Sequence, residues 1–208
     1  MNKFNISIPT NIPDIENAYD HGMLPQRNKR GLFYIDSSCR SQLKQLTLTS
    51  ENKRVIRKTS SFSCIRETTQ DFKFDHVVQK NCHFWAKSLS WQFPTKSIKT
   101  VFTDHIFNYI YTWKHNQKII AYAVCLFTSN ISHIAYVFYN SSYQKQNLVN
   151  AMVLKTITDS FDKSLNYCYL GRFDPQKNIG YYKRDMPAFQ VFNQHDQIWQ
   201  TYKQYKNL

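Results

Sequence analysis

Two apolar runs in the second half of the chain set its hydrophobic pattern. Ile119–Phe127 and Ile131–Tyr139 are each of strand length and rich in β-branched and aromatic residues. Only the polar residues Thr128–Asn130 separate them. Two such runs joined by a short polar break are typical of paired antiparallel strands. The sequence therefore predicts a β-hairpin over residues 119–139.

A helical pattern and a third apolar run follow the hairpin. Within Asn147–Phe161, apolar residues recur at the spacing of one helix face: Val149, Met152, Val153, Ile157 and Phe161. Tyr167–Leu170 is short, apolar and ends before Gly171. Because strand–helix–strand crossovers are right-handed, we expect Tyr167–Leu170 to run parallel to Ile134–Tyr139. A hairpin that leads into such a crossover predicts a mixed α/β sheet.

The N-terminal part has shorter patterns. Pro13 and Asp14 suit the first turn of a helix that Gly22 can end in a left-handed conformation. Leu32–Ile35 and the alternating Leu43–Leu48 predict strands. Residues 1–10 are expected to form a loose arm.

A polar stretch, Ser60–Thr69, is interpreted as a linker. It divides the chain into a small N-terminal lobe, residues 1–69, and a main domain, residues 70–208. Further elements of the main domain are expected as helices at 72–82 and 84–89, a last strand at 188–192 and a short C-terminal helix at 198–205.

Composition narrows the class of protein. The chain has 208 residues, of which 42% are hydrophobic, enough for one good core. Its four glycines nearly exclude a Gly-rich phosphate loop. No apolar run reaches about 18 residues, so no membrane span is expected, and the N-terminus lacks a signal-peptide layout. Five scattered cysteines predict reduced thiols in a cytoplasmic protein.

The formal net charge of +13 predicts a polyanionic partner, with nucleic acid first and an anionic membrane second. Four cations fall within six residues, at Lys53, Arg54, Arg57 and Lys58; we call them the cationic segment. Val55 and Ile56 are expected to anchor it while the cations project toward RNA phosphates. The alternative is a solvated helix face, in a chain whose surplus of lysine serves solubility.

Four blocks in order resemble a known family. They are Ile120–Val124, Tyr136–Asn140, Tyr167–Gly171 and the pair Tyr182-Lys183. In this order and spacing they resemble the C-terminal half of the N-end-rule aminoacyl-tRNA–protein transferases, the arginyl- and leucyl-tRNA–protein transferases. Asn52–Lys58 resembles a basic stretch of the same family.

The resemblance implies a GNAT-like (acyl-CoA N-acyltransferase-type) α/β fold. It also implies transfer of arginine or leucine from aminoacyl-tRNA to the N-terminal α-amine of acceptor proteins, which are usually acidic at that end and are thereby marked for degradation. The expected partners are aminoacyl-tRNA and acceptor protein N-termini, with no membrane and no cofactor.

The ester of an aminoacyl-tRNA is already activated, so the enzyme has to position it, accept a proton and stabilise an oxyanion. Strand alternation is taken to place Tyr136 and Tyr139 on one face, where a tyrosine could stack on the terminal adenine; the alternative is a core role for these rings. The expected catalytic residues are Tyr139, Tyr169 and Lys183. The residues expected to bind tRNA or substrate are Arg40, Lys53, Arg54, Arg57, Lys58, Tyr136, Asn140, Arg172 and Tyr182.

Other functions stay open because the chain departs both from the acyl-CoA-binding pattern of the fold and from the pattern of the resembled transferase family. Acyl-CoA-binding members of the fold carry glycines where this chain has Asn147 and Val149. An acyl-CoA N-acetyltransferase is therefore the alternative enzyme. Asn140 replaces an aspartate of the resembled family, which leaves a non-catalytic tRNA-binding relative as a further alternative. A duplex-DNA-binding protein would need a recognition helix, and none is evident.

No metal site is predicted. The histidines lack the spacing of a zinc site, and no Cys-x₂-Cys pair is present. Of the family's N-terminal cysteine cluster, only Cys39 falls in the corresponding region.

Overall fold

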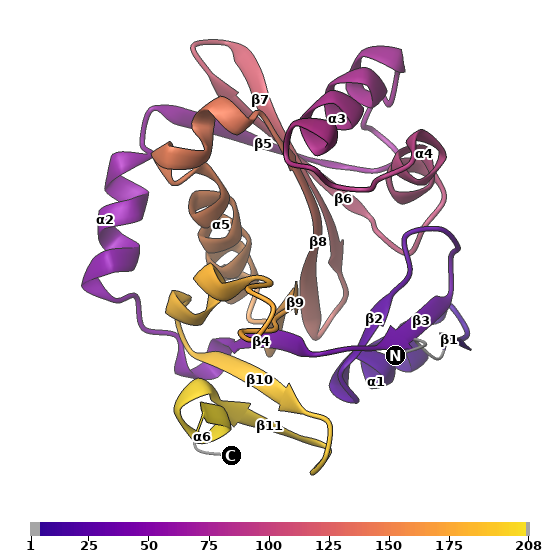
Figure 1. Cartoon of the computed structure of the whole chain (residues 1–208), viewed down its shortest axis with the longest axis vertical. Helices are drawn as coiled ribbons and strands as arrows, with labels where there is room; N and C mark the ends of the chain where they lie inside the picture. The colour runs from indigo at the N-terminus through magenta and orange to yellow at the C-terminus, as the bar shows by residue number, and fades with distance from the viewer. Residues whose placement is uncertain (1–4, 207–208) are drawn as a thin grey trace.

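The molecule is built on one large sheet with helices on both faces (Figure 1). It is a computed structural model that describes residues 5–206, so the first four residues of the expected arm lie outside it. The sheet has eight strands, in the order β11 (Ile198–Thr201), β10 (Phe189–Asn193), β4 (Ser38–Gln42), β9 (Tyr167–Arg172), β8 (Ile131–Tyr139), β7 (Lys118–Phe127), β6 (Tyr109–His115) and β5 (Phe62–Thr68).

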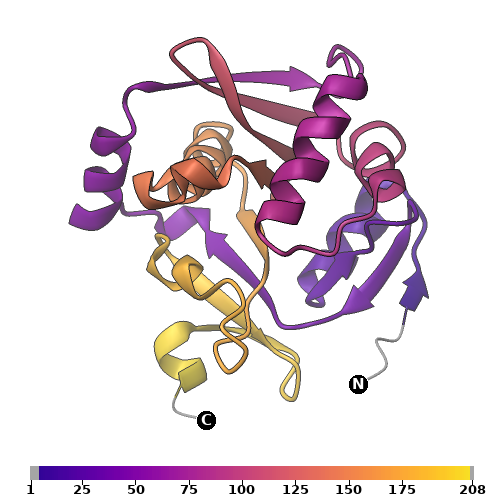
Figure 2. The ribbon, with the colours of Figure 1, turned by 45° about the horizontal axis from the view of Figure 1, so that its top comes forward.

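Two layers cover this sheet, as the turned view in Figure 2 shows. One core contains side chains from α2 (Ser50–Lys58) and α5 (Leu148–Asp162). The other contains side chains from α1 (Ile12–Asp20), α3 (His76–Ser88) and α4 (Thr95–Thr103). A small sheet of β1 (Asn5–Ser7), β3 (Leu32–Ile35) and β2 (Met23–Pro25) lies beside α1. The remaining short helices are η1 (Leu43–Gln45), η2 (Ser141–Gln146), η3 (Tyr181–Asp185) and α6 (Tyr202–Lys206).

The predicted hairpin and crossover are both confirmed. β7 and β8 pair antiparallel, and β8 pairs parallel with β9. The crossover helix α5 buries Met152, Val153 and Ile157, as its apolar spacing indicates, whereas Phe161, expected on the same face, is 48% exposed. The helix expected after Pro13 is also confirmed as α1, and the strand at Leu32–Ile35 as β3.

Several local predictions were wrong. Part of the expected loose arm forms β1, which pairs with β3, and the helices expected at 72–82 and 84–89 are the single helix α3. Leu43–Leu48 is no strand; pairing ends with β4, and η1 follows. The stretch interpreted as a linker forms β5, which pairs with β6 along its whole length. An edge strand buries only alternate side chains, so its sequence is polar enough to resemble a linker. The C-terminal segment begins as β11 and becomes helical only at α6.

The division at residue 69 stays a prediction. β4, from the first part of the chain, lies between β9 and β10 of the second part. Within residues 5–206, no helix is long and apolar enough to cross a membrane. All five cysteines are free thiols.

Arg40 joins the N-terminal segment to the C-terminal strands. Its guanidinium lies 3.6 Å from the ring centroid of Tyr167 and 4.0 Å from that of Trp199. The same group donates to Gln190 Oε1 at 2.9 Å and to Asp20 Oδ1 at 3.1 Å. With only 5% of its surface exposed, Arg40 contacts protein groups from α1, β9, β10 and β11. It thus holds the sheet together.

We expect Arg40→Ala to lower the free energy of unfolding by about 3 kcal/mol, because it removes two ring contacts and leaves buried polar groups without a partner. Urea denaturation measures this change. Arg57→Ala, an exposed arginine on α2, should stay within about 0.5 kcal/mol of the wild type. Equal stability of Arg40→Ala and the wild type would contradict the structural role of Arg40.

Candidate functional site

A cleft opens where β8 and β9 part. Their pairing covers three residues and ends at His133 and Tyr169, although β8 continues to Tyr139. Beyond that point each strand has one extra residue against its other neighbour, Ala135 on β8 and Leu170 on β9. Such bulges bend a strand and increase its twist. Two bulges side by side therefore account for the separation of the strands.

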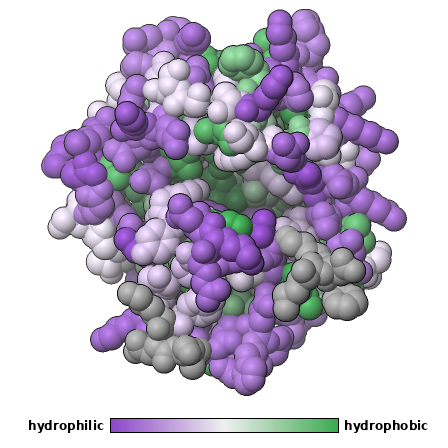
Figure 3. Space-filling view, viewed as in Figure 1, coloured by the Kyte–Doolittle hydropathy of each residue, from purple (hydrophilic) through white to green (hydrophobic). Residues whose placement is uncertain are grey.

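Two chambers occupy this cleft, which we call the β8–β9 cleft. The larger measures about 420 Å³ and the smaller about 210 Å³. Ala135, Tyr136, Leu170 and Lys183 line both of them. Figure 3 shows an apolar hollow near the centre of this face, surrounded by hydrophilic residues. The larger chamber has the volume for a ring system, and the smaller one has the volume for a small polar group attached to it.

The larger chamber is mostly apolar. Trp91 and Phe93 approach from the loop before α4, Val153 from α5, and Tyr182 from η3. Its other lining residues are Ile134, Val137, Phe138, Asn178, Ile179 and Gly180. Aromatic rings at the entrance of an apolar chamber suit the face of a planar ligand.

The smaller chamber carries several polar and basic side chains among apolar ones. Tyr34, His133, Arg172 and Lys183 line it together with Tyr136. Burial raises the pKa of Tyr34 to about 12 and lowers that of His133 to about 3. At neutral pH the chamber therefore presents a neutral phenol and a neutral imidazole beside two basic side chains. Leu24 and Pro25 complete its wall.

Lys183 comes from η3 and enters both chambers. Its Nζ donates to the carbonyl oxygen of Arg172 at 2.9 Å. Burial lowers its pKa, and the nearby Arg172 charge acts in the same direction. Gly180, at φ 66°, begins the turn that carries Lys183, and a Cβ there would lie 2.5 Å from the Arg172 carbonyl oxygen. Only glycine fits this position without a clash.

The structure brings four of the predicted site residues together. Tyr136, Arg172, Tyr182 and Lys183 all line the cleft. Arg172 Nε also pairs with Asp36 Oδ2 at 2.6 Å. Tyr182 and Lys183 reach the cleft because the short η3 helix returns to the ends of β8 and β9, and their roles in the site stay a prediction.

The expected shared face of Tyr136 and Tyr139 is wrong. The two are three residues apart, so an alternating strand directs them to opposite faces. Tyr136 packs with the core of α1, α3 and α4, and Tyr139 belongs to the core of α5. Tyr139 lies against Trp91, and Tyr169 is fully buried, where its hydroxyl accepts from Arg40 at 3.2 Å. Neither is among the residues that line the cleft.

The other predicted binding residues lie elsewhere. Arg40 is committed to the contacts described above. Asn140 caps η2, where its side chain accepts from Ser142 N at 3.0 Å. The cationic segment lies on α2, and Ile56 there is 42% exposed, so the expectation that it anchors the segment is wrong. Val55 does anchor α2, with 2% exposure.

α2 lies next to the helix that carries Lys183. Asn52 Nδ2 donates to the carbonyl oxygen of Asp185 at 3.0 Å, and Asp185 is two residues beyond Lys183. Asn52 also forms a reciprocal capping pair with Thr49 at the start of α2. One buried side chain therefore fixes both the start of α2 and its position relative to η3.

Sequence reasoning missed His133 and its partner Tyr19. His133 is 3% exposed, and its Nδ1 lies 2.7 Å from the hydroxyl oxygen of Tyr19. A histidine inside an otherwise apolar strand was the available signal. The contact with Tyr19 joins positions 114 residues apart, and no local pattern reveals it.

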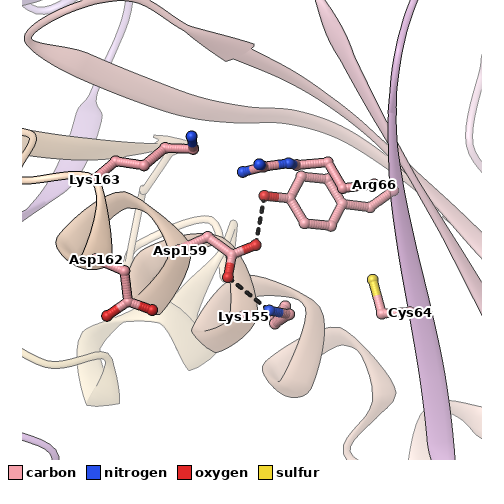
Figure 4. A pocket seen from close by; sticks show the side chains of 7 residues that line it. Cys64, Arg66, Lys155, Asp159, Asp162 and Lys163 are labelled. Atoms are coloured by element: carbon pink, nitrogen blue, oxygen red, sulfur yellow. Dashed lines mark hydrogen bonds and ion pairs between the residues drawn. The ribbon is translucent and has the colours of Figure 1, made fainter. Parts of the chain in front are cut away.

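A second pocket, of about 430 Å³, lies between β5 and α5 (Figure 4). Its central carboxylate is already engaged: Asp159 accepts from Tyr111 at 2.8 Å and from Lys155 at 2.6 Å. The β8–β9 cleft instead contains a buried ring nitrogen, Nε2 of His133, without a hydrogen-bond partner. We therefore assign the candidate site to the cleft.

No group of three or more His, Cys, Asp or Glu side chains could hold a metal ion in the part of the chain that the structure describes. At the start of α5, Asn147 has φ 60°, the left-handed conformation that glycine adopts most readily. Asparagine tolerates this conformation, so the turn survives without glycine. Its side chain occupies one of the two positions where acyl-CoA-binding members of the fold have none.

Solved structures share this fold at low sequence identity. The C-terminal domain (DUF2156) of a putative lysylphosphatidylglycerol synthetase from Agrobacterium fabrum has a TM-score of 0.56 and 9% identity, with 88% of this chain and 63% of that chain covered. L-PGS from Bacillus licheniformis has a TM-score of 0.51 and 10% identity, with 82% of this chain and 54% of that chain covered. FemX has a TM-score of 0.56 and 8% identity, covering 91% and 69%.

The chain thus spans less than two-thirds of the first two structures, and the likeness shows a GNAT-like α/β fold. No curated protein sequence matches the chain. Residues 57–193 do match the sequence profile of the family described as arginine-tRNA-protein transferase, C terminus. That match includes β8, β9 and η3, the three elements of the cleft. Because it covers well over half of the chain, the protein belongs to the family of arginine-tRNA-protein transferase C-terminal domains.

Proposed function

We propose that the protein transfers an amino acid, arginine or leucine, from aminoacyl-tRNA to the N-terminal α-amine of acceptor proteins in the cytoplasm, and that this addition marks them for degradation. The observation that supports it most is the position of Lys183, a family-matching residue, in the cleft between β8 and β9. Family membership supports the same general reaction.

The chemistry of the cleft suits an activated ester. Attack by an amine needs no protein nucleophile, and the residues have to hold the ester carbonyl and balance its developing negative charge. Lys183 is the cation available for this purpose, since it lines both chambers and, among the described residues, its Nζ donates only to the carbonyl oxygen of Arg172. Lys183 therefore contacts the aminoacyl end of the donor.

The larger chamber suits the terminal adenosine of the tRNA. Tyr182 is 38% exposed and Trp91 is 42% exposed, so both side chains are partly accessible. Stacking of a base on such rings contributes about 1–3 kcal/mol. Tyr136, which lines both chambers, then lies between the adenosine and the aminoacyl ester.

The cationic segment supplies contacts to the RNA backbone. Lys53, Arg57 and Lys58 are exposed on α2, whereas Arg54 pairs with Glu51. Because Asn52 ties α2 to η3, RNA phosphates on α2 and an aminoacyl end near Lys183 can belong to one molecule. The net charge of +13 favours such a polyanion.

The proposed function predicts a mass gain on acceptor peptides. The protein is incubated with charged total tRNA and with peptides that begin with Asp, Glu or Ala. We expect arginine or leucine on the acidic peptides, measured by mass spectrometry, and no addition when the tRNA is deacylated beforehand. A thermal shift with acetyl-CoA, together with no aminoacyl addition, would instead support an acyl-CoA N-acetyltransferase. Binding of tRNA without any transfer would indicate a non-catalytic relative.

The role of α2 predicts a weaker and less salt-dependent interaction with tRNA in Lys53→Gln/Arg57→Gln. The slope of log affinity against log salt should fall by up to about 1.8, since each of the two lost phosphate contacts contributes about 0.7–0.9. Filter binding at several salt concentrations measures it. Lys96→Gln/Lys99→Gln removes two exposed cations from the nine-residue helix α4 and controls for net charge. The same slope change in both variants would contradict a specific role for α2.

The partly buried position of Lys183 predicts a trade-off between stability and activity. Lys183→Met should unfold at an equal or higher temperature at pH 7, because it removes a desolvated ammonium. Since burial lowers the folded pKa, the difference should shrink as pH rises toward about 10.4, where the unfolded lysine also loses its charge. Transfer should fall at least about 10-fold. A stable variant with unchanged transfer would exclude Lys183 from the reaction.

A further inference from the structure

His133 has one ring nitrogen engaged and the other free. Nδ1 lies 2.7 Å from the Tyr19 hydroxyl, and Nε2 is buried without a hydrogen-bond partner among the described residues. Buried polar atoms normally have a hydrogen-bond partner. A buried nitrogen without one beside a cavity therefore indicates that a ligand supplies the partner. His133 lines the smaller chamber of the cleft.

The hydrogen bond between Tyr19 and His133 fixes which ring nitrogen of His133 carries the hydrogen. Tyr19 is fully buried, burial raises the pKa of its phenol, and within residues 5–206 its hydroxyl contacts only His133 as a hydrogen-bond partner. The hydroxyl hydrogen must then be donated to Nδ1, because no other acceptor is present. A neutral imidazole carries one hydrogen, so that hydrogen is on Nε2 and His133 is a donor toward the chamber.

Nε2 and the Lys183 ammonium face the same space. Gly171, at φ 82°, has no side chain between them: a Cβ there would lie 3.6 Å from His133 Nε2 and 3.8 Å from Lys183 Nζ. Lys183 donates one of its three hydrogens to the Arg172 carbonyl, which leaves two. Two sets of donors from different elements therefore converge on a space large enough for one oxygen.

We propose that the Nε2–H of His133 and the Lys183 ammonium form the oxyanion-binding pair of this site, with Tyr19 as the residue that positions the imidazole. The proposal rests on the function proposed above and adds to it the residue that binds the ester carbonyl oxygen. In the reaction, the amine nitrogen bonds to the ester carbonyl carbon, and the carbonyl π electrons move to the oxygen. That oxygen accepts from His133 and Lys183.

Collapse of the intermediate balances the reaction. The carbonyl double bond re-forms, the ester C–O bond breaks, and the attacking nitrogen loses a proton to solvent. The ribose oxygen of the tRNA leaves and takes up a proton. His133 stays neutral throughout, because burial first, and then the charge of Lys183 and nearby His105, hold its pKa near 3. A neutral donor stabilises the oxyanion without placing a second buried charge beside Lys183.

The test compares ring-preserving variants with a matched control. His133→Phe removes the donor, and its kcat should fall about 100-fold with little change in KM for aminoacyl-tRNA. Tyr19→Phe keeps the aromatic ring but removes the hydroxyl that fixes the tautomer of His133. We therefore expect a smaller fall in kcat, of about 10-fold. His115→Phe is the control: His115 ends β6, packs against Phe62 with ring centroids 5.2 Å apart and is not among the residues that line the cleft. It should retain kcat within about twofold. Near-ultraviolet circular dichroism checks that each variant is folded.

A second measurement needs no activity. Nitrogen-15 NMR of histidine-labelled wild-type protein should show the hydrogen of His133 on Nε2, and Tyr19→Phe should change the tautomer ratio. A hydrogen on Nδ1, or a folded His133→Phe with wild-type kcat, would overturn the oxyanion role while leaving amino-acid transfer intact. No transfer by the wild-type protein, with the hydrogen on Nε2, would instead reject the proposed function and with it the oxyanion role.

Discussion

The parting of β8 from β9 is the constraint on which the rest of the structure depends. Two neighbouring parallel strands would normally share hydrogen bonds along their length, and these two stop after three residues. The bulges at Ala135 and Leu170 impose this early end, and Gly171 at φ 82° permits it on the β9 side. Paired strands would leave no room for either chamber. The site is therefore a consequence of backbone geometry before it is a set of side chains.

The surrounding contacts resist closure of that gap. Arg40, between the rings of Tyr167 and Trp199, holds β9 to β4 and to the C-terminal hairpin. On the other strand, β7 pairs with β8 up to Tyr139 and keeps it in the opposite half of the sheet. A buried arginine is costly unless its donors are paired, and here α1, β9 and β10 all supply acceptors. Arg40, which was expected to contact RNA, thus stabilises the β9 side of the cleft.

Elements with strong, local patterns could be predicted, and those that depend on distant partners could not. The hairpin, α5 and the parallel β9 follow from apolar spacing and crossover handedness alone. β5 was missed because an edge strand needs an apolar side chain only at alternate positions. Within the cleft, Lys183 could be named from a local motif. His133 was missed because its partner Tyr19 is 114 residues away, and Tyr139 was misplaced by a simple error of alternation.

The scarcity of glycine now has a more specific meaning. Asn147 adopts the left-handed backbone conformation before α5 that glycine would favour. The turn is therefore formed, but the asparagine side chain occupies space that a glycine would leave empty. A pyrophosphate needs bare backbone N–H groups at that helix start, whereas an RNA backbone can be held by side chains on a separate helix. The chain has glycine where the cleft requires it, at Gly171 and Gly180, and has asparagine at the left-handed position before α5. The retained and lost glycines together favour an RNA-borne donor over acyl-CoA.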